Sequence, residues 1–486
     1  MVQIRDEGIG AKDNPKSRTM KDKPQIGRLG QWLNSWVQSD GAIHGFHNHP
    51  VWGDNPFRYL DFTAGHSTFA SPFLLGLALA LKQQPNARGK NLLGRLARFQ
   101  ANSFQKDGQF AHIGFQVGET LKAGLIHNVV PCVVLSALEP SEISDSAVRK
   151  VLASCDRIYG AGATEYSVAN QEYCRLWARL LHMQTYGHKE WHDSVAAGLD
   201  FLIERFHVRG HPDGECVGTW RVLSDLSGLE PAEYYGLMIH PLLLAYERYG
   251  KKQYLDEASA MARHCARSSW VDGRGQRRAH RLWTQATGAW QVLRQPMLIG
   301  GYGITLSAIQ ALVRAQRDEE LENFLQAMDA TYVHYQSGAG FFLAATGWGS
   351  EQDIIPSTAW QSHDFFHLIA RHGPDQNFWD NLFGTDSATA VVFGQSMVWI
   401  EDQSHWAVRG YHWTNGLNLV GRKDRLNFYV DIASWIQSKR EAPAAYLMPD
   451  EPKFLRGSDA IYHIGGRSRL HVLGVDAIPF RGQKTK

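Results

Sequence analysis

The sequence predicts a mainly α-helical fold in which six helix pairs close into an (α/α)6 toroid, followed by a small antiparallel β region. Three observations predict it. Two kinds of helical pattern alternate over residues 27–375, Asp-Gly turns recur between them, and short strand-like segments follow Pro374. A single helix pair cannot bury its own apolar face, so the repeated pairs must pack on one another. An open superhelical solenoid is the structural alternative.

The first kind of pattern is apolar, with helical spacing and small residues, and we expect it to form the inner helices. Its segments are 69–82, 121–138, 166–184, 234–249, 299–315 and 358–371. The second kind carries charges on one face, and we expect it to form the outer helices. Its segments are 27–38, 90–104, 143–158, 190–206, 253–268 and 318–335.

Turns and helix starts repeat along the chain. Asp40-Gly41, Asp107-Gly108 and Asp272-Gly273 each follow an outer segment, and such a pair offers a side-chain acceptor and a residue that tolerates positive φ. Histidine and proline recur near the starts of inner segments, as in His127 with Pro131 and His240 with Pro241. Proline fits the first turn of a helix or kinks it later, so a polar cluster is expected at each of these bends.

The pattern predicts three regions. Residues 1–26 read as a polar tail, 27–384 as the toroid, and 385–486 as the β-rich region. The strand-like segments are short, rich in Val, Ile and aromatic residues, and separated by turn residues. They are 388–400, 406–413, 426–429, 460–464 and 469–473, and 432–438 has a helical pattern.

Composition excludes several classes of protein. Lys and Arg number 50 against 48 Asp and Glu, so no strong positive charge indicates nucleic-acid binding. No apolar run reaches the roughly 20 residues that span a bilayer, and no signal peptide is evident, so we expect a cytoplasmic protein without membrane contact. The five scattered cysteines predict buried free thiols. Oligomeric state is not indicated.

One stretch adds a family resemblance. Glu233-Tyr234-Tyr235 precedes His240 and Tyr246, within the helix repeat and its Asp-Gly loops. Together these features resemble the six-hairpin, (α/α)-toroid carbohydrate-active enzymes, which include glucuronyl-hydrolase-like glycosidases and toroid polysaccharide lyases. The resemblance covers most of residues 27–375. It implies an oligosaccharide or polysaccharide substrate and a pocket near the starts of the inner helices.

Carboxylates near those starts are the catalytic candidates, because glycoside hydrolysis uses a proton donor and a second carboxylate. Glu233 is our first choice for the acid, since neighbouring aromatic rings raise a carboxyl pKa; the alternative is a first-turn Glu favoured by the helix dipole. Asp364 or Glu172 is the expected partner. Glu172 alternatively forms a salt bridge to Arg175 or Arg179. The other carboxylates near inner-helix starts are Asp61, Glu119, Glu165 and Glu230.

Aromatic and polar side chains beside these carboxylates are the predicted substrate contacts, because flat rings pack on the apolar faces of sugars. A cationic residue among them suits a uronate carboxylate, so we expect an acidic, uronate-containing oligosaccharide. The predicted contacts are His66, His127, Asn128, Asn170, Arg281, Trp283, Tyr302, Trp360 and His363.

Alternatives of function remain open. A polysaccharide lyase would use Tyr234 or His240 as the base that removes a proton next to a uronate carboxyl group. A non-catalytic saccharide-binding scaffold would have the aromatic residues but no converging carboxylates. The histidines of residues 44–49 lie in a Gly- and Pro-bounded loop without a zinc-site spacing, and Gly300–Gly303 lacks a surrounding βαβ unit. We therefore expect neither a metal nor a nucleotide cofactor.

Overall fold

The computed structural model describes the helical repeat and short pieces of the remaining chain. These residues are 23–34, 37, 39–43, 47–48, 60–61, 66–104, 107–110, 124–161, 168–207, 229–271, 275–280, 283–286, 289–292, 301–336, 340, 342, 344–345, 354–355, 358–384, 398–402, 405–409, 461–464 and 470–473.

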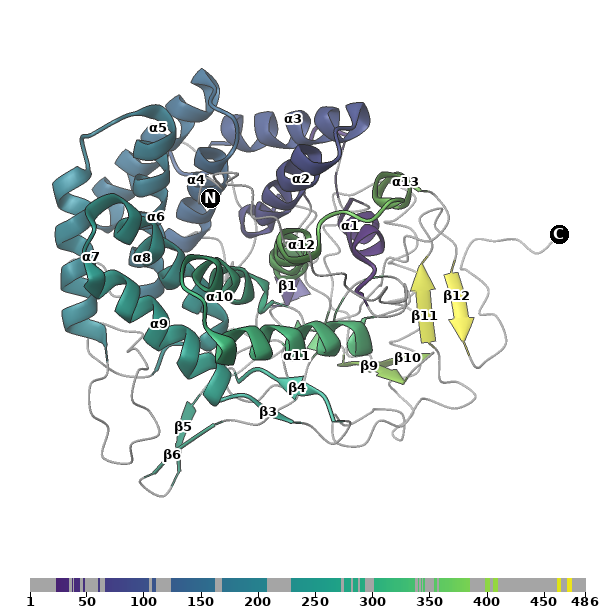
Figure 1. Cartoon of the computed structure of the whole chain (residues 1–486). Helices are drawn as coiled ribbons and strands as arrows, with labels where there is room; N and C mark the ends of the chain where they lie inside the picture. The colour runs from purple at the N-terminus through teal and green to yellow at the C-terminus, as the bar shows by residue number, and fades with distance from the viewer. Residues whose placement is uncertain are drawn as a thin grey trace, which may run out of the picture. The chain divides into compact units, whose positions relative to one another are not determined.

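All twelve predicted helical segments form helices (Figure 1). The apolar set comprises α2 (Pro72–Gln83), α4 (Leu125–Ala137), α6 (Ala169–Tyr186), α8 (Tyr235–Tyr249), α10 (Gly303–Ala315) and α12 (Thr358–His372). The charged set comprises α1 (Ile26–Asn34), α3 (Ala87–Asn102), α5 (Glu142–Tyr159), α7 (His192–Phe206), α9 (Lys252–Arg267) and α11 (Glu319–Tyr335). A short helix that the sequence did not predict follows, α13 (Phe378–Phe383).

Local sequence explains where these helices begin and end. The Asn86 side chain accepts the Gly89 N–H at the start of α3, and Ser141 does the same for Ser144 at the start of α5. Helices α6 and α8 end at Gly187 and Gly250, which adopt the left-handed conformation that glycine tolerates best.

Prolines also mark the apolar set, as predicted. Pro72 is the first residue of α2, whereas Pro131 and Pro241 lie inside α4 and α8. Two short 3-10 turns, η2 (Thr68–Ala70) and η3 (Ala232–Tyr234), precede α2 and α8. They place polar residues immediately before a buried helix.

The chain divides into two compact units. The first comprises residues 1–25, 132–293 and 304–335. In it, α6 packs on α7 and α8, and α8 packs on α9; these helices lie side by side in Figure 1. Helices α8 and α10 approach so closely that a Cβ on Gly236 would lie 2.2 Å from the Ile304 carbonyl oxygen. Only glycine fits there, because normal van der Waals contact requires a longer distance.

The second unit comprises residues 26–131, 294–303 and 336–486. Its core is formed by α12 on α2 and by α1 on α12 and α13. Gly76 of α2 faces the Phe365 ring, and a Cβ on this glycine would lie 2.4 Å from the ring.

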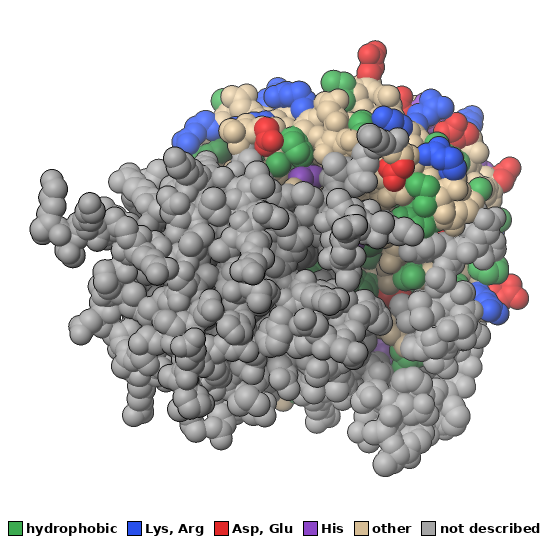
Figure 2. Space-filling model, turned by 180° about the vertical axis from the view of Figure 1, so that it is seen from behind, with side chains coloured by type: hydrophobic (Ala, Val, Ile, Leu, Met, Phe, Trp, Pro, Cys, Tyr) green, Lys and Arg blue, Asp and Glu red, His purple; other side chains and the backbone are tan. Residues whose placement is uncertain are grey.

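Figure 2 shows basic and acidic side chains interspersed over the described part of one face.

All described strands form two-stranded antiparallel ladders. The pairs are β1 (His47–Asn48) with β2 (Leu60–Asp61), β3 (Trp270–Val271) with β4 (Arg277–Arg278), β5 (Trp283–Ala286) with β6 (Ala289–Val292), β7 (Ala344–Ala345) with β8 (Ile354–Ile355), β9 (Val398–Asp402) with β10 (His405–Arg409), and β11 (Ile461–Ile464) with β12 (Leu470–Leu473).

The last two pairs agree with strands predicted beyond residue 385, whereas segments 426–429 and 432–438 lie outside the described residues. The hairpins at 270–292 were not predicted. The three-region division stays a prediction. Cys132, Cys155, Cys174 and Cys265 are buried and free, as expected. None of the described helices has the length and apolar character needed to cross a membrane.

Candidate functional site

In the second unit, several predicted contact residues anchor loops. Residues two positions beyond the glycines Gly41, Gly108 and Gly340 donate their backbone N–H to a polar side chain near the start of an apolar helix. The three bonds are Ile43 to His66 Nδ1 at 3.1 Å, Phe110 to Asn128 Oδ1 at 3.0 Å and Phe342 to Gln361 Oε1 at 2.7 Å. All three glycines have positive φ. The predicted turn repeat is therefore present, and it is tied to the helix starts.

His66 shows what this anchoring does to chemistry. Its Nδ1 accepts from Ile43, so Nε2–H donates to Gln100 Oε1 at 2.7 Å, and both ring nitrogens are satisfied. Burial lowers the pKa of His66 to about 4, so the ring is neutral near pH 7. Asn128 likewise donates to Gln109 Oε1 at 2.9 Å. Both side chains have roles in holding loops; their contact with a substrate stays a prediction.

Asp364 binds backbone, not a second carboxylate. Its two oxygens accept the N–H groups of Gly301 at 2.7 Å and Gly303 at 3.0 Å, and the side chain is fully buried. A carboxylate that receives N–H groups at a helix start is stabilised in its ionised form by those donors and by the helix dipole. This geometry suits a structural clasp for the start of α10.

Aromatic rings gather around Phe69 in the same unit. Phe69 lies 4.8 Å from His363 and 5.5 Å from Trp360, measured between ring centroids, and it lies 6.0 Å from His127. His127 and His363 are buried, whereas Trp360 is partly exposed. The structure thus brings His127, Trp360 and His363 together around one ring. Tyr302, also predicted as a contact, is fully buried.

In the first unit, the carboxyl of Glu230 contacts Asn170 and interacts electrostatically with Glu233. Glu230 Oε1 accepts from Asn170 Nδ2 at 2.6 Å, and Oε2 makes no hydrogen bond to a described residue. Burial raises the pKa of Glu230 well above its usual range; the charge of Glu233 adds to the shift, and the Asn170 hydrogen bond opposes it. Burial therefore favours the protonated form of the Glu230 carboxyl over its ionised form. Glu233, three residues on in η3, is fully buried.

Thr305 fixes the backbone that carries Glu233. Its hydroxyl accepts the Gly236 N–H at 2.9 Å and lies 2.9 Å from the carbonyl oxygens of Ala232 and of Glu233, to which it donates. The short helix–helix distance at Gly236 makes this reach possible. The side chain of Thr305, on α10, therefore fixes the position of the acidic turn η3, which precedes α8.

His240 lies on α8, beyond this turn, and its ring stacks on Trp177 with centroids 4.7 Å apart. Ser307 donates its hydroxyl proton to the Ile304 carbonyl at 2.8 Å, so it accepts the His240 Nε2–H at 3.0 Å. Nδ1 then carries the lone pair. Desolvation lowers the pKa of His240 to about 3, so the partly exposed ring is neutral.

Glu172 lies in a buried ion network. Arg175 donates to both of its oxygens at 2.9 and 2.8 Å and also contacts Asp156 at 3.3 Å; Arg179 contacts Asp156 as well. Burial raises the pKa of Glu172 to about 7, and Arg175 opposes that shift. This is the salt bridge that the sequence offered as the alternative for Glu172. Its catalytic role stays a prediction.

Of the remaining predicted site residues, the structure places Tyr234 and Trp283 but does not describe Arg281. Tyr234 ends η3 and is partly exposed. Trp283 begins β5, a strand and not a helix start, and Arg281 lies outside the described residues. Most of the histidine-rich segment 44–49 also lies outside them.

Sequence reasoning included Glu230 among the carboxylates but did not select it. The available signal was its three-residue spacing from Glu233 and the following Pro231, which keeps Glu230 extended. Its pairing with Asn170 spans 60 residues, so no local pattern reveals it. Trp177, Thr305 and Ser307 were missed for the same reason.

Comparison with known proteins identifies the fold. No protein-family profile and no curated protein matches the sequence. A D-mannose isomerase structure has 11% identity and a TM-score of 0.50, covering 76% of this chain and 99% of that one. Cellobiose 2-epimerase from Bacillus thermoamylovorans has 11% identity and a TM-score of 0.50, covering 71% and 98%. A family 76 glycoside hydrolase (mannosidase) from Bacteroides thetaiotaomicron has 12% identity and a TM-score of 0.49, covering 72% and 97%.

These similarities concern architecture. At such identities they define only the fold class, which is the (α/α)6 toroid that the sequence predicted. The substrate and reaction of this chain do not follow from the fold.

Proposed function

We propose that this protein is a carbohydrate-processing enzyme that hydrolyses a glycosidic bond in an oligosaccharide, with Glu230 as general acid. The supporting observation is the buried carboxyl of Glu230, whose pKa is raised by burial and by the charge of Glu233, and whose Oε2 makes no hydrogen bond to a described residue. Hydrolysis of a glycoside needs such a pair, one carboxyl to protonate the leaving oxygen and the other as base or nucleophile.

The roles follow from the two environments. Burial and the nearby charge of Glu233 raise the pKa of Glu230 and so favour its protonated form, which can donate a proton to the leaving group. Asn170 orients its Oε1 and leaves Oε2 for the proton. Thr305 holds the backbone of Glu233, which acts as the second carboxylate. In this proposal Glu230, and not Glu233 as favoured from the sequence, is the general acid.

The fold supports the substrate class by analogy only. The two structures with TM-scores of 0.50 are described as a D-mannose isomerase and a cellobiose 2-epimerase, both named for sugars. Specificity for a uronate rests on Arg281 in the sequence and stays a prediction. Catalytic roles for Asp364 and Glu172, and the predicted substrate contacts, are likewise untested.

A second candidate reaction begins with removal of a proton, and the neutral His240 favours it. Its Nε2–H is committed to Ser307, which leaves Nδ1 as a base on a partly exposed ring. Abstraction of a proton next to a carbonyl or carboxyl group starts both β-elimination by a lyase and isomerisation of a sugar. Tyr234, beside Glu233, is the other predicted base.

One product screen separates these reactions. The purified protein is incubated in D2O with neutral and uronate-containing oligosaccharides, and products are followed by reducing-end release, ultraviolet absorbance of a new C4=C5 bond, and deuterium incorporation. We expect reducing ends without new absorbance or deuterium at carbon. Absorbance that rises with cleavage indicates a lyase, and deuterium incorporation without cleavage indicates an isomerase. No turnover of any substrate, with saccharide binding retained, indicates a non-catalytic scaffold and contradicts the proposal.

Two substitutions assign the residues. Glu230→Gln should lower the rate of oligosaccharide cleavage about 10²–10⁴-fold, while Glu247→Gln, at an exposed position on α8, should leave it intact. A His240→Gln variant that loses activity while Glu230→Gln keeps it would instead favour proton abstraction.

A further inference from the structure

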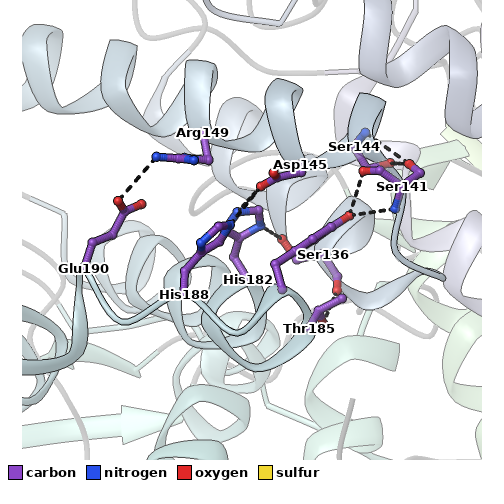
Figure 3. A network of polar contacts seen from close by, with 10 residues as sticks. Ser136, Ser141, Ser144, Asp145, Arg149, His182, Thr185, His188 and Glu190 are labelled. Carbon is purple, nitrogen blue, oxygen red and sulfur yellow. Dashed lines mark hydrogen bonds and ion pairs between the residues drawn. The ribbon is translucent and has the colours of Figure 1, made fainter.

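A second polar cluster lies at the opposite end of α6, away from Glu230. Asp145 is in the first turn of α5, His182 lies four residues before the end of α6, and His188 follows the left-handed Gly187 that caps this helix. Asn170 and His182 are twelve residues apart on one helix, so about 18 Å separates the two clusters along the axis. Figure 3 shows the side chains of Asp145, His182 and His188 converging.

The three ligand atoms of this cluster lie within 4.8 Å of one another. His182 Nε2 lies 2.9 Å and His188 Nε2 lies 3.2 Å from the same oxygen, Asp145 Oδ1. Two ligand atoms of a tetrahedral zinc ion are separated by about 3.3 Å, given metal–ligand bonds of about 2.0–2.1 Å. Both N–O distances are therefore close to those of a coordination shell.

His182 supplies the observation that points to a cation. Its side chain is fully buried, and among the described residues Nε2 makes an ion-pair contact with Asp145 Oδ1 at 2.9 Å but no aligned hydrogen bond. The contact is short but lacks the alignment of a hydrogen bond. On the other side of the ring, Nδ1 lies 3.4 Å from Ser136 Oγ. When Nδ1–H donates to Ser136, the Nε2 lone pair faces a carboxylate, which is unfavourable unless a cation lies between them.

The surroundings allow an ion to enter and be held. The side chains of Asp145 and His188 are each 29% exposed, so the cluster opens to solvent on one side and is closed by His182 on the other. Arg149, the nearby cation in Figure 3, is paired with Glu190 at 3.5 Å, which offsets its charge. Two imidazoles and one carboxylate suit a borderline-soft divalent ion better than Ca²⁺ or Mg²⁺, which prefer oxygen ligands.

We propose that Asp145, His182 and His188 form a binding site for a divalent transition-metal ion with the chemistry of Zn²⁺. The ion takes Nε2 of each histidine and one oxygen of Asp145, with water in the fourth position. It joins the start of α5 to the end of α6 and to the segment that follows, so its effect is on stability and not on the proposed reaction.

The test measures metal binding and its effect on unfolding. The full chain is stripped with a chelator, dialysed against Zn²⁺, and analysed for zinc content and melting temperature; Co²⁺ is used as a spectroscopic probe. We expect one zinc ion per chain, a melting temperature that rises with zinc, and a Co²⁺ spectrum of a four-coordinate N/O site. His188→Ala and Asp145→Asn should weaken zinc binding at least about tenfold.

His192→Ala is the matched control. His192 contacts the carboxylate of Asp193 at 2.9 Å but is not part of the cluster, so zinc binding should be unchanged. His188 and Asp145 are partly exposed, and circular dichroism verifies that their variants fold. No stoichiometric zinc in the wild type, no change in its melting temperature, or equal binding by all variants, which indicates adventitious binding only, would overturn the proposal.

Discussion

Replacing Thr305 by valine tests whether one hydroxyl holds the acidic turn in place. Valine matches threonine in shape but cannot accept the Gly236 N–H or donate to the carbonyls of Ala232 and Glu233. The Ala232 carbonyl keeps the N–H of Tyr235, so the main loss is the acceptor of the Gly236 N–H. A buried N–H without an acceptor costs about 1–3 kcal/mol, and we expect the free energy of unfolding to fall by about that amount.

Urea unfolding measures this change, and turnover of the substrate found in the product screen measures its effect on chemistry. Thr305→Val should lower kcat, because the backbone of Glu233 loses its tie, and Thr305→Ser should restore both values. Thr331→Val is a control for stability alone, since the hydroxyl of Thr331, on α11, donates to the carbonyls of Arg277 in β4 and of Ala327 on its own helix. A Thr305→Val protein with the stability and kcat of the wild type would refute the argument.

Three other substitutions follow from the same contacts. The wild type should lose stability as the pH falls from 6.5 towards 4, because the folded protein disfavours protonation of His66. The shift of the His66 pKa from 6.5 to about 4 corresponds to about 3.4 kcal/mol. His66→Gln should remove this part of the pH dependence, as measured by unfolding curves at several pH values. Gly236→Ala should destabilise by at least about 1–3 kcal/mol in urea, since its Cβ has no room; an unchanged midpoint would contradict the close helix contact. Asp364→Ala should cost about 2–6 kcal/mol by leaving two buried glycine N–H groups unpaired, and a melting temperature equal to that of the wild type would exclude the clasp.

Helices could be predicted well because their signal is local. The 3.6-residue periodicity placed every helix of the repeat within a few residues, and Asp-Gly pairs located turns such as Gly41 and Gly108. The β3–β4 and β5–β6 hairpins were missed because strands of two to four residues carry too little alternation to detect.

The candidate site was predicted only in part, because its contacts join distant residues. Asp364 accepts the N–H of Gly301, which lies 63 residues away, so no local pattern shows this contact; its catalytic role stays a prediction. Glu230 has only Pro231 and its spacing from Glu233 as local signals, whereas its raised pKa arises from burial and its orientation from Asn170, 60 residues away. Glu172 and Arg175 are three residues apart on one helix, so that ion pair was visible in advance.

The most direct test of the proposed function compares Glu230→Gln with the wild type on two glycosides that differ only in the leaving group. Glutamine retains the acceptor for Asn170 but cannot donate a carboxyl proton. For a sugar leaving group we predict a fall in kcat of about 10²–10⁴-fold, and for an acidic phenol, which leaves without protonation, a much smaller fall. Equal losses on both substrates, or full activity on the oligosaccharide, would contradict the role of Glu230 as the general acid.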